Sequence, residues 1–274
     1  MKIVTLMENE ACGSGLTAAR GLSQYIETGS HKLLFDMGPD GSFADNAKAL
    51  GVDLSQVDLA VLSHGHSDHG GGLKAFRAVN RQADVFARPE AFGEYYAVLP
   101  GKEPQYIGLE KDLQPDRDRM VSTAAGQRLG EGLTLLGEVP NTFSWTPVVE
   151  KLREKTAEGF RRDTFLHEQH LLVEDGGKAA LFAGCAHGGI VNIVRAAEEH
   201  LGRRPDAVFG GFHFFELPET PESLELLTAT GRELAKGDTV YYTGHCTGDY
   251  AFGVLRGILG QRLRPMHAGT VVEL

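Results

Sequence analysis

Three short apolar segments, far apart in the chain, each end in glycine and histidine residues. They run into Ser63-His64-Gly65-His66-Ser67-Asp68-His69-Gly70, Gly184-Cys185-Ala186-His187-Gly188 and Gly244-His245-Cys246. Short apolar runs bounded by glycines are typical of buried strands. Polar groups crowded beside buried strands are costly unless they find a partner. A fold that brings these strand ends together around a bound metal ion would provide that partner.

The first of these clusters has the composition of a metal site. His64 and His66 are two residues apart, so an extended backbone would direct both side chains to the same side. Asp68 and His69 follow where flanking glycines allow the chain to turn sharply. A single histidine here would be typical of a hydrogen-bonded polar residue, but three histidines and an aspartate favour a metal. Imidazole and carboxylate ligands suit Zn²⁺ and, less selectively, Fe or Mn.

The rest of the sequence predicts one α/β domain over residues 1–274. No linker or repeat divides it. Residues 93–120 contain three prolines and mixed charges, which predicts an irregular insertion that could cover a site. Strands are predicted at 3–8, 22–28, 32–36, 57–62, 84–87, 133–136, 170–174, 179–183, 206–209, 239–243 and 270–274, and helices at 43–50, 73–79, 190–201, 221–235 and 250–259.

The composition narrows the function class. A formal net charge of −10 argues against a nucleic-acid-binding protein, because such a protein needs a basic surface. No segment approaches the roughly 20 apolar residues that cross a bilayer. The widely spaced Cys12, Cys185 and Cys246 do not form a disulfide framework. We therefore expect a cytoplasmic protein that acts on a small molecule, without a membrane partner; the sequence carries no signal for an oligomeric state.

The pattern His64-x-His66-x-Asp68-His69-Gly70 resembles the signature of the metallo-β-lactamase superfamily of metal-dependent hydrolases. The resemblance implies a four-layer αββα sandwich with a metal centre along one edge of its two sheets. Leu33-Leu34-Phe35-Asp36-Met37-Gly38 resembles the strand-ending Asp-x-Gly of the family, which implies that Asp36 holds a ligating loop from behind. His187 and His245 resemble the later ligands.

The sequence departs from the family pattern at two places. Val139-Pro140-Asn141-Thr142 lacks a histidine that many members carry, and Cys185 stands where many have a bridging aspartate. Cys185 could bridge two ions as a thiolate or be a small buried residue. The motifs Gly-Cys-Ala-His, Gly-Gly-Phe-His and Thr-Gly-His-Cys resemble a branch similar to 7,8-dihydropterin-6-methyl-4-(β-D-ribofuranosyl)aminobenzene-5′-phosphate synthases.

We expect a hydrolase that uses metal-activated water on a small anionic or phosphate-bearing metabolite. It would bind one or two Zn ions, and Fe or Mn are the alternative metals. Asp68 would orient the water or accept its proton, and His213 would bind substrate or a leaving-group oxygen. A C–N bond-forming synthase and a non-catalytic metal-binding sensor are the alternatives. Basic residues at 151–162 could reach a phosphate or form a solvated helix face. The expected ligands are His64, His66 and His187 for one ion and Asp68, His69 and His245 for the other.

Overall fold

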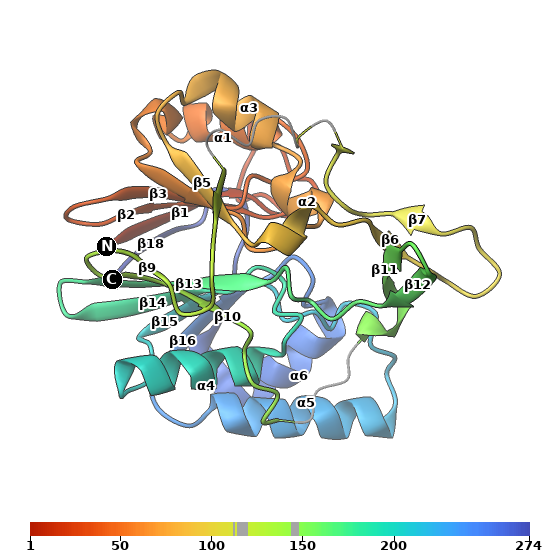
Figure 1. The fold of residues 1–274 in the computed structure, drawn as a ribbon. Coiled ribbons are helices and arrows are strands. Elements are labelled where there is room, and N and C mark those ends of the chain that lie inside the picture. Colours follow the sequence, from red (N-terminus) through yellow and green to blue (C-terminus); the bar gives the residue numbers. More distant parts are fainter. Residues whose placement is uncertain (112, 114–119, 144–147) are drawn as a thin grey trace.

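Two mixed sheets pack face to face in the computed structural model, which describes residues 1–111, 113, 120–143 and 148–274 (Figure 1). The first sheet has the order β18 (Val271–Glu273), β1 (Lys2–Met7), β2 (Ser23–Glu27), β3 (Lys32–Phe35), β4 (Leu59–Val61), β5 (Asp84–Ala87) and β8 (Met120–Ser122). The second has the order β17 (Leu263–Pro265), β16 (Val240–Thr243), β15 (Ala207–Phe209), β14 (Lys178–Phe182), β13 (Gln169–Asp175), β10 (Leu133–Gly137) and β9 (Arg128–Gly130).

Helices cover the outer face of each sheet. The first sheet is covered by α1 (Ser42–Ala49) and α3 (Leu73–Val79), and the second by α4 (Ile190–Leu201), α5 (Pro221–Leu234) and α6 (Asp249–Leu259) (Figure 1). The predicted four-layer αββα sandwich is confirmed. None of the helices in the described part of the chain combines the length and apolar character that a membrane span requires.

The continuous apolar runs in the sequence arise because the strands are buried on both faces. In β3, Leu33 and Phe35 pack between the sheets, whereas Leu34 packs against the helices of the first layer. In β14, Phe182 packs between the sheets and Leu181 packs against α4–α6. Successive side chains of a strand point to opposite faces, so a two-sided core requires apolar residues at every position.

Parallel pairing places the chemistry-bearing loops at one edge. In the first sheet β3 pairs parallel with β4, and in the second β14, β15 and β16 run parallel to one another. The carboxyl ends of these strands therefore meet, because parallel strands end on the same side of a sheet. The residues that follow them are Asp36, His64, His187, His213 and His245.

The segment expected to be an irregular insertion contains ordered strands. β6 (Tyr95–Ala97) and β7 (Gln105–Tyr106) form a four-stranded sheet with β11 (Leu152–Thr156) and β12 (Gly159–Arg162). The sequence missed these strands because each is short, and β7 and β12 are exposed at every position. The helix face considered for the basic residues at 151–162 is wrong, because four of them lie on the hairpin of β11 and β12 and Lys151 ends a 3₁₀ turn just before it. Residues 112 and 114–119 lie outside the described part.

Candidate metal centre

Four buried histidines from three distant loops meet at the edge between the two sheets. Nε2 of His69 lies 3.1 Å from Nε2 of His245, and Nε2 of His64 lies 3.4 Å from Nε2 of His187. His64 and His69 follow β4, and the latter is on the short helix α2 (Ser67–Gly70). The expected convergence of these four residues is therefore present in the structure.

Cys185 lies between the two histidine pairs. Its Sγ lies 3.2 Å from Nε2 of His69. Its Sγ and ring nitrogens of His64 and His187 all lie within 4.8 Å of one another, and the same holds for Cys185 with His69 and His245. Burial raises the pKa of this thiol well above its ordinary value in the absence of a metal. A single sulfur atom is thus shared by two groups of candidate ligands.

Asp68 lies beside the second histidine pair. Its carboxylate oxygens are 3.9 Å from Nε2 of His69 and 3.6 Å from Nε2 of His245. Burial alone would raise the pKa of Asp68, but the positive charges of the neighbouring His69 and Arg20 help to outweigh it, and the value falls to about 2. The carboxylate is therefore ionised at neutral pH, as a metal ligand must be.

His66 lies near the predicted ligands His64 and His187 but also near two residues that were not predicted as ligands. Its ring centroid lies 4.6 Å from that of His64 and 5.1 Å from that of His187. The group of candidate ligand atoms that includes His66 within 4.8 Å, however, is the one with Asp163 and His167. Its Nε2 is buried without a hydrogen-bond partner, and burial lowers its pKa to about 3, so the ring is neutral. A buried neutral nitrogen with a free lone pair needs a hydrogen-bond donor or a Lewis acid, and a metal ion would be a Lewis acid.

Asp36 lies directly behind the first cluster in a left-handed backbone conformation, with φ of 59°. One carboxylate oxygen accepts hydrogen bonds from His69 Nδ1 and Ser63 Oγ, each at 2.7 Å, and the other accepts from Ser63 N at 2.7 Å. Ser63 Oγ in turn accepts from His64 Nδ1 at 2.8 Å. With both Nδ1 atoms acting as donors, the Nε2 atoms of His64 and His69 face the centre.

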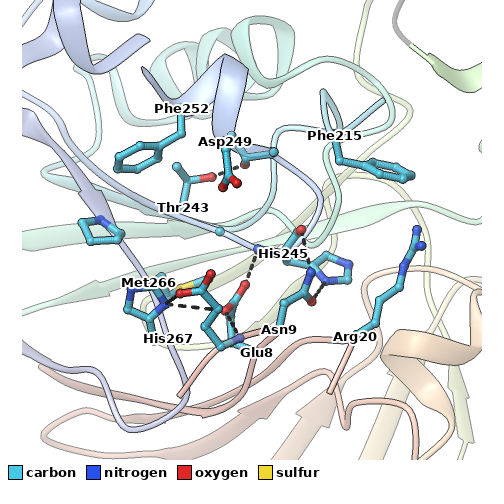
Figure 2. A pocket seen from close by; sticks show the side chains of 15 residues that line it. Glu8, Asn9, Arg20, Phe215, Thr243, His245, Asp249, Phe252, Met266 and His267 are labelled. Carbon is cyan, nitrogen blue, oxygen red and sulfur yellow. Dashed lines mark hydrogen bonds and ion pairs between the residues drawn. The ribbon is translucent and has the colours of Figure 1, made fainter. Parts of the chain in front are cut away.

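His245 is oriented in the same manner from the opposite side. Its Nδ1 lies 3.0 Å from Oδ1 of Asn9, whose amide nitrogen donates to the His245 carbonyl at 2.9 Å, and Glu8 accepts from the His245 backbone N–H (Figure 2). His187 is held through its backbone, which donates to Glu168 at 2.7 Å. The sequence missed Glu8, Asn9 and Glu168, because nothing in the local pattern marks them.

Two of the candidate histidine ligands are neutral without a metal, whereas His69 is protonated at neutral pH and has to release a proton to bind one. Burial, reinforced by the neighbouring imidazoles, lowers the pKa of His64 and of His187 well below the ordinary value. At His69 the carboxylates of Asp36 and Asp68 outweigh burial and raise the pKa to about 9. Mostly neutral imidazoles with one carboxylate and one thiol have the chemistry of a zinc or iron site. The residues present therefore fit the metal that the fold implies.

A cavity of about 280 Å³ opens onto this cluster, and we call it the cleft. Asp68, Cys185, His187 and His245 lie in its floor. His213 also lines the cleft, with its ring centroid 4.3 Å from that of His187 and a ring nitrogen within 4.8 Å of the thiols of Cys185 and Cys246. The other lining residues include Arg20, Ala97, Leu99, Tyr106, Ile107, Lys151, Leu152, Phe215 and Glu216.

Known proteins resemble this chain over most of its length. The model of the Metallo-beta-lactamase superfamily matches residues 18–245. The chain is 28% identical to the 7,8-dihydropterin-6-methyl-4-(beta-D-ribofuranosyl)-aminobenzene-5′-phosphate synthase of Methanocaldococcus jannaschii, in an alignment covering 100% of this chain and 96% of the relative. An uncharacterised protein of the same organism is 26% identical over 72% of this chain and 73% of its own length.

Solved structures share the fold. Tm1679, a metal-dependent hydrolase of the beta-lactamase superfamily, superposes with a TM-score of 0.82 at 26% identity, covering 100% of this chain and 99% of its own. Zn²⁺-bound PqqB from Methylobacterium extorquens shares the fold at a TM-score of 0.58, with 13% identity and full coverage of both chains. The family match spans most of the chain and includes the strand-end histidines, so this protein belongs to the metallo-β-lactamase superfamily.

Proposed function

We propose that the protein is a metal-dependent hydrolase that binds two zinc ions and acts on a small anionic metabolite. The observation that carries this proposal is the pair of histidine groups that share Cys185 at the floor of an open cleft. Iron or manganese in place of zinc would leave the assignment of the residues unchanged. The relationship to a metal-dependent hydrolase at 26% identity over the whole chain supports it.

Each group would hold one ion. His64, His66 and His187 would bind the first, and Asp68, His69 and His245 would bind the second, with the Cys185 sulfur between them. Divalent ions there would supply Lewis acidity, which makes water acidic enough to lose a proton and act as a nucleophile near neutral pH. Asp36, Asn9 and Glu168 keep the imidazoles and their loops in place through the hydrogen bonds described above.

Asp68 and His213 would handle protons and substrate. Asp68 is ionised and about one quarter of its side chain is exposed to the cleft, so it can accept a proton from attacking water. His213 faces the cleft beside His187 and lies in a third group with Cys185 and Cys246, and its ring nitrogens have no hydrogen-bond partner among the described residues. Its imidazole is therefore free to donate a hydrogen bond to a substrate or leaving-group oxygen.

The test combines metal analysis with hydrolysis. Purified protein should contain about two equivalents of zinc, and its activity on a screen of phosphodiesters, lactones and thioesters should disappear with a chelator and return with zinc. Asp68→Ala should abolish turnover, whereas Asp84→Ala, exposed on β5, should leave it unchanged. Full activity of the Asp68→Ala variant would refute the proposed role.

A second candidate is a C–N bond-forming synthase. The relative of that description, aligned over the whole chain, favours it. Incubation with a hydroxymethyl-dihydropterin diphosphate and a ribosyl-aminobenzene phosphate separates the two: diphosphate release with formation of the C–N product supports the synthase. Hydrolysis without coupling supports the hydrolase.

A further inference from the structure

Two cations pack against one aromatic ring beside the metal centre. The guanidinium carbon of Arg20 lies 4.7 Å from the ring centroid of Phe215, and Nζ of Lys151 lies 4.9 Å from it. Arg20 precedes β2, Lys151 precedes β11 and Phe215 follows β15, so three distant segments build this element. All three residues line the cleft, and Figure 2 shows Arg20 and Phe215 on the same side of His245.

The aromatic ring holds both cations in place, and Arg20 is the one that is open to a ligand. Stacking on an aromatic face restricts a long side chain without using its hydrogen-bond donors. The Arg20 side chain is 64% exposed, and its contact with Asp68 is long, at 3.9 Å. A metal ion held by Asp68 would neutralise part of the carboxylate charge and so weaken the attraction between Asp68 and Arg20. Lys151 is mostly buried and pairs with Glu216, which itself lies at the cleft.

The wall next to these cations is apolar. Leu99, Tyr106, Ile107 and Leu152 line the cleft from the small sheet formed by β6, β7, β11 and β12 and from its connections. Leu99 and Tyr106 are 37% and 36% exposed, so part of this apolar surface faces solvent. A ligand that satisfies both features carries a negative group and an apolar or aromatic body.

We propose that Arg20, Lys151 and Phe215 form an anion-binding subsite that holds the phosphate or carboxylate group of the substrate while its apolar body lies on the small sheet. The assignment rests on the proposed function only in calling that ligand the substrate. Arginine offers a planar fork of donors that matches phosphate and carboxylate, and lysine adds a point charge. The subsite selects which anionic molecules enter the cleft; the chemistry remains with the metal ligands.

Calorimetric titration of the zinc-loaded protein with stable probes tests the subsite. The probes are phenylphosphonate, methylphosphonate, benzoate, benzyl alcohol and benzylamine. Phenylphosphonate or benzoate should bind most tightly, because each combines an anion with a ring, and the tighter of the two identifies the anion. Arg20→Met and Lys151→Met should each weaken that probe about tenfold, the loss expected for one charge-assisted contact.

Matched controls separate this proposal from the proposed function. Arg161→Met removes an exposed cation on β12 that does not line the cleft and should not change binding. Zinc content of the Arg20 and Lys151 variants should equal that of the parent, and their effect on probe affinity should persist in metal-free protein. Unchanged affinity in both variants, or tighter binding of benzylamine than of the anions, would overturn the subsite. Absence of bound zinc or of hydrolysis would instead count against the proposed function.

Discussion

The Sγ atom of Cys185 lies 3.2 Å from Nε2 of His69, and this contact joins the two sheets at the candidate metal centre. His69 follows a strand of the first sheet and Cys185 follows a strand of the second. Within the described residues, Cys185 is also the one residue shared by the His64–His187 group and the His69–His245 group. The sulfur therefore lies within reach of both groups of candidate ligands.

Cys185→Ala should lower metal binding without unfolding the protein. Removing a shared ligand weakens both sites. We therefore expect a competing chelator to remove the second equivalent of zinc at about 10- to 100-fold lower chelator concentration. This is the loss of metal affinity that accompanies removal of residues that support metal ligands. Titration with a chromophoric chelator measures this. Cys12→Ala, an exposed cysteine, is the control. Equal zinc affinity in the Cys185 variant and the parent would assign Cys185 to packing alone.

Asp36→Asn tests the orientation of His69. Asparagine tolerates the left-handed conformation at this position, so the substitution removes charge while keeping the backbone. Loss of charge-assisted hydrogen bonds in a buried network should reduce the free energy of unfolding by about 1–3 kcal/mol. Zinc affinity should fall as well, because the imidazole of His69 loses its fixed orientation. Urea denaturation of metal-free protein and chelator competition measure the two effects.

Asp40→Asn provides the comparison for that experiment. Asp40 lies four residues further along the same loop, and its carboxylate bonds only to Ser42 among the hydrogen bonds of the described residues. Its replacement should leave zinc affinity unchanged. A loss of zinc affinity in both variants alike would point to a general disturbance of the loop and would contradict the specific role of Asp36.

The sequence identified the ligating loops but not the residues that hold them. His64, His69, His187 and His245 stand beside glycines at strand ends, a local pattern that a single sequence displays. Asn9, by contrast, reaches His245 across 236 positions, and nothing near it in the chain marks that contact. Arg20, Lys151 and Phe215 were missed as a group for the same reason, since only the folded chain brings them together.

Most strands and helices could be predicted because the core is two-sided and its apolar runs are continuous. The helices Leu73–Val79 and Ile190–Leu201 and the strand Asp84–Ala87 have the predicted bounds. The small sheet could not be predicted, because the strand Gly159–Arg162 is exposed at every position and carries no hydrophobic pattern.

Gly65→Ala should destabilise the ligating loop. A Cβ atom at this position would lie 2.2 Å from the backbone oxygen of Ala91, which cannot move as a flexible side chain could. Such overpacking costs about 1–3 kcal/mol. Thermal unfolding of metal-free protein should show a lower midpoint than the parent. Gly13→Ala, where nothing lies within 4 Å of the added atom, should change the midpoint little, and equal effects of the two substitutions would contradict the packing argument.

The stability contributed by Asp206 should depend on pH. Burial alone would raise the pKa of its carboxyl, but hydrogen bonds from Ala179 N and from Arg203 and Lys178 hold the pKa below its ordinary value of 3.8. A depressed pKa in the folded state stabilises the protein above the unfolded value and loses that effect as the pH falls through the folded value. Asp206→Asn should therefore be less stable than the parent at pH 7 and at pH 5, with a difference that narrows below pH 3.8. Urea denaturation at several pH values measures it, and a difference that widens on acidification would contradict the assignment.

Anomalous diffraction from crystals of the zinc-loaded protein, recorded on both sides of the zinc absorption edge, tests the metal centre most directly. Two peaks are expected, one among His64, His66 and His187 and one among Asp68, His69 and His245, with the Cys185 sulfur between them. A single peak at His66, Asp163 and His167, or no peak at this edge of the sheets, would contradict the account.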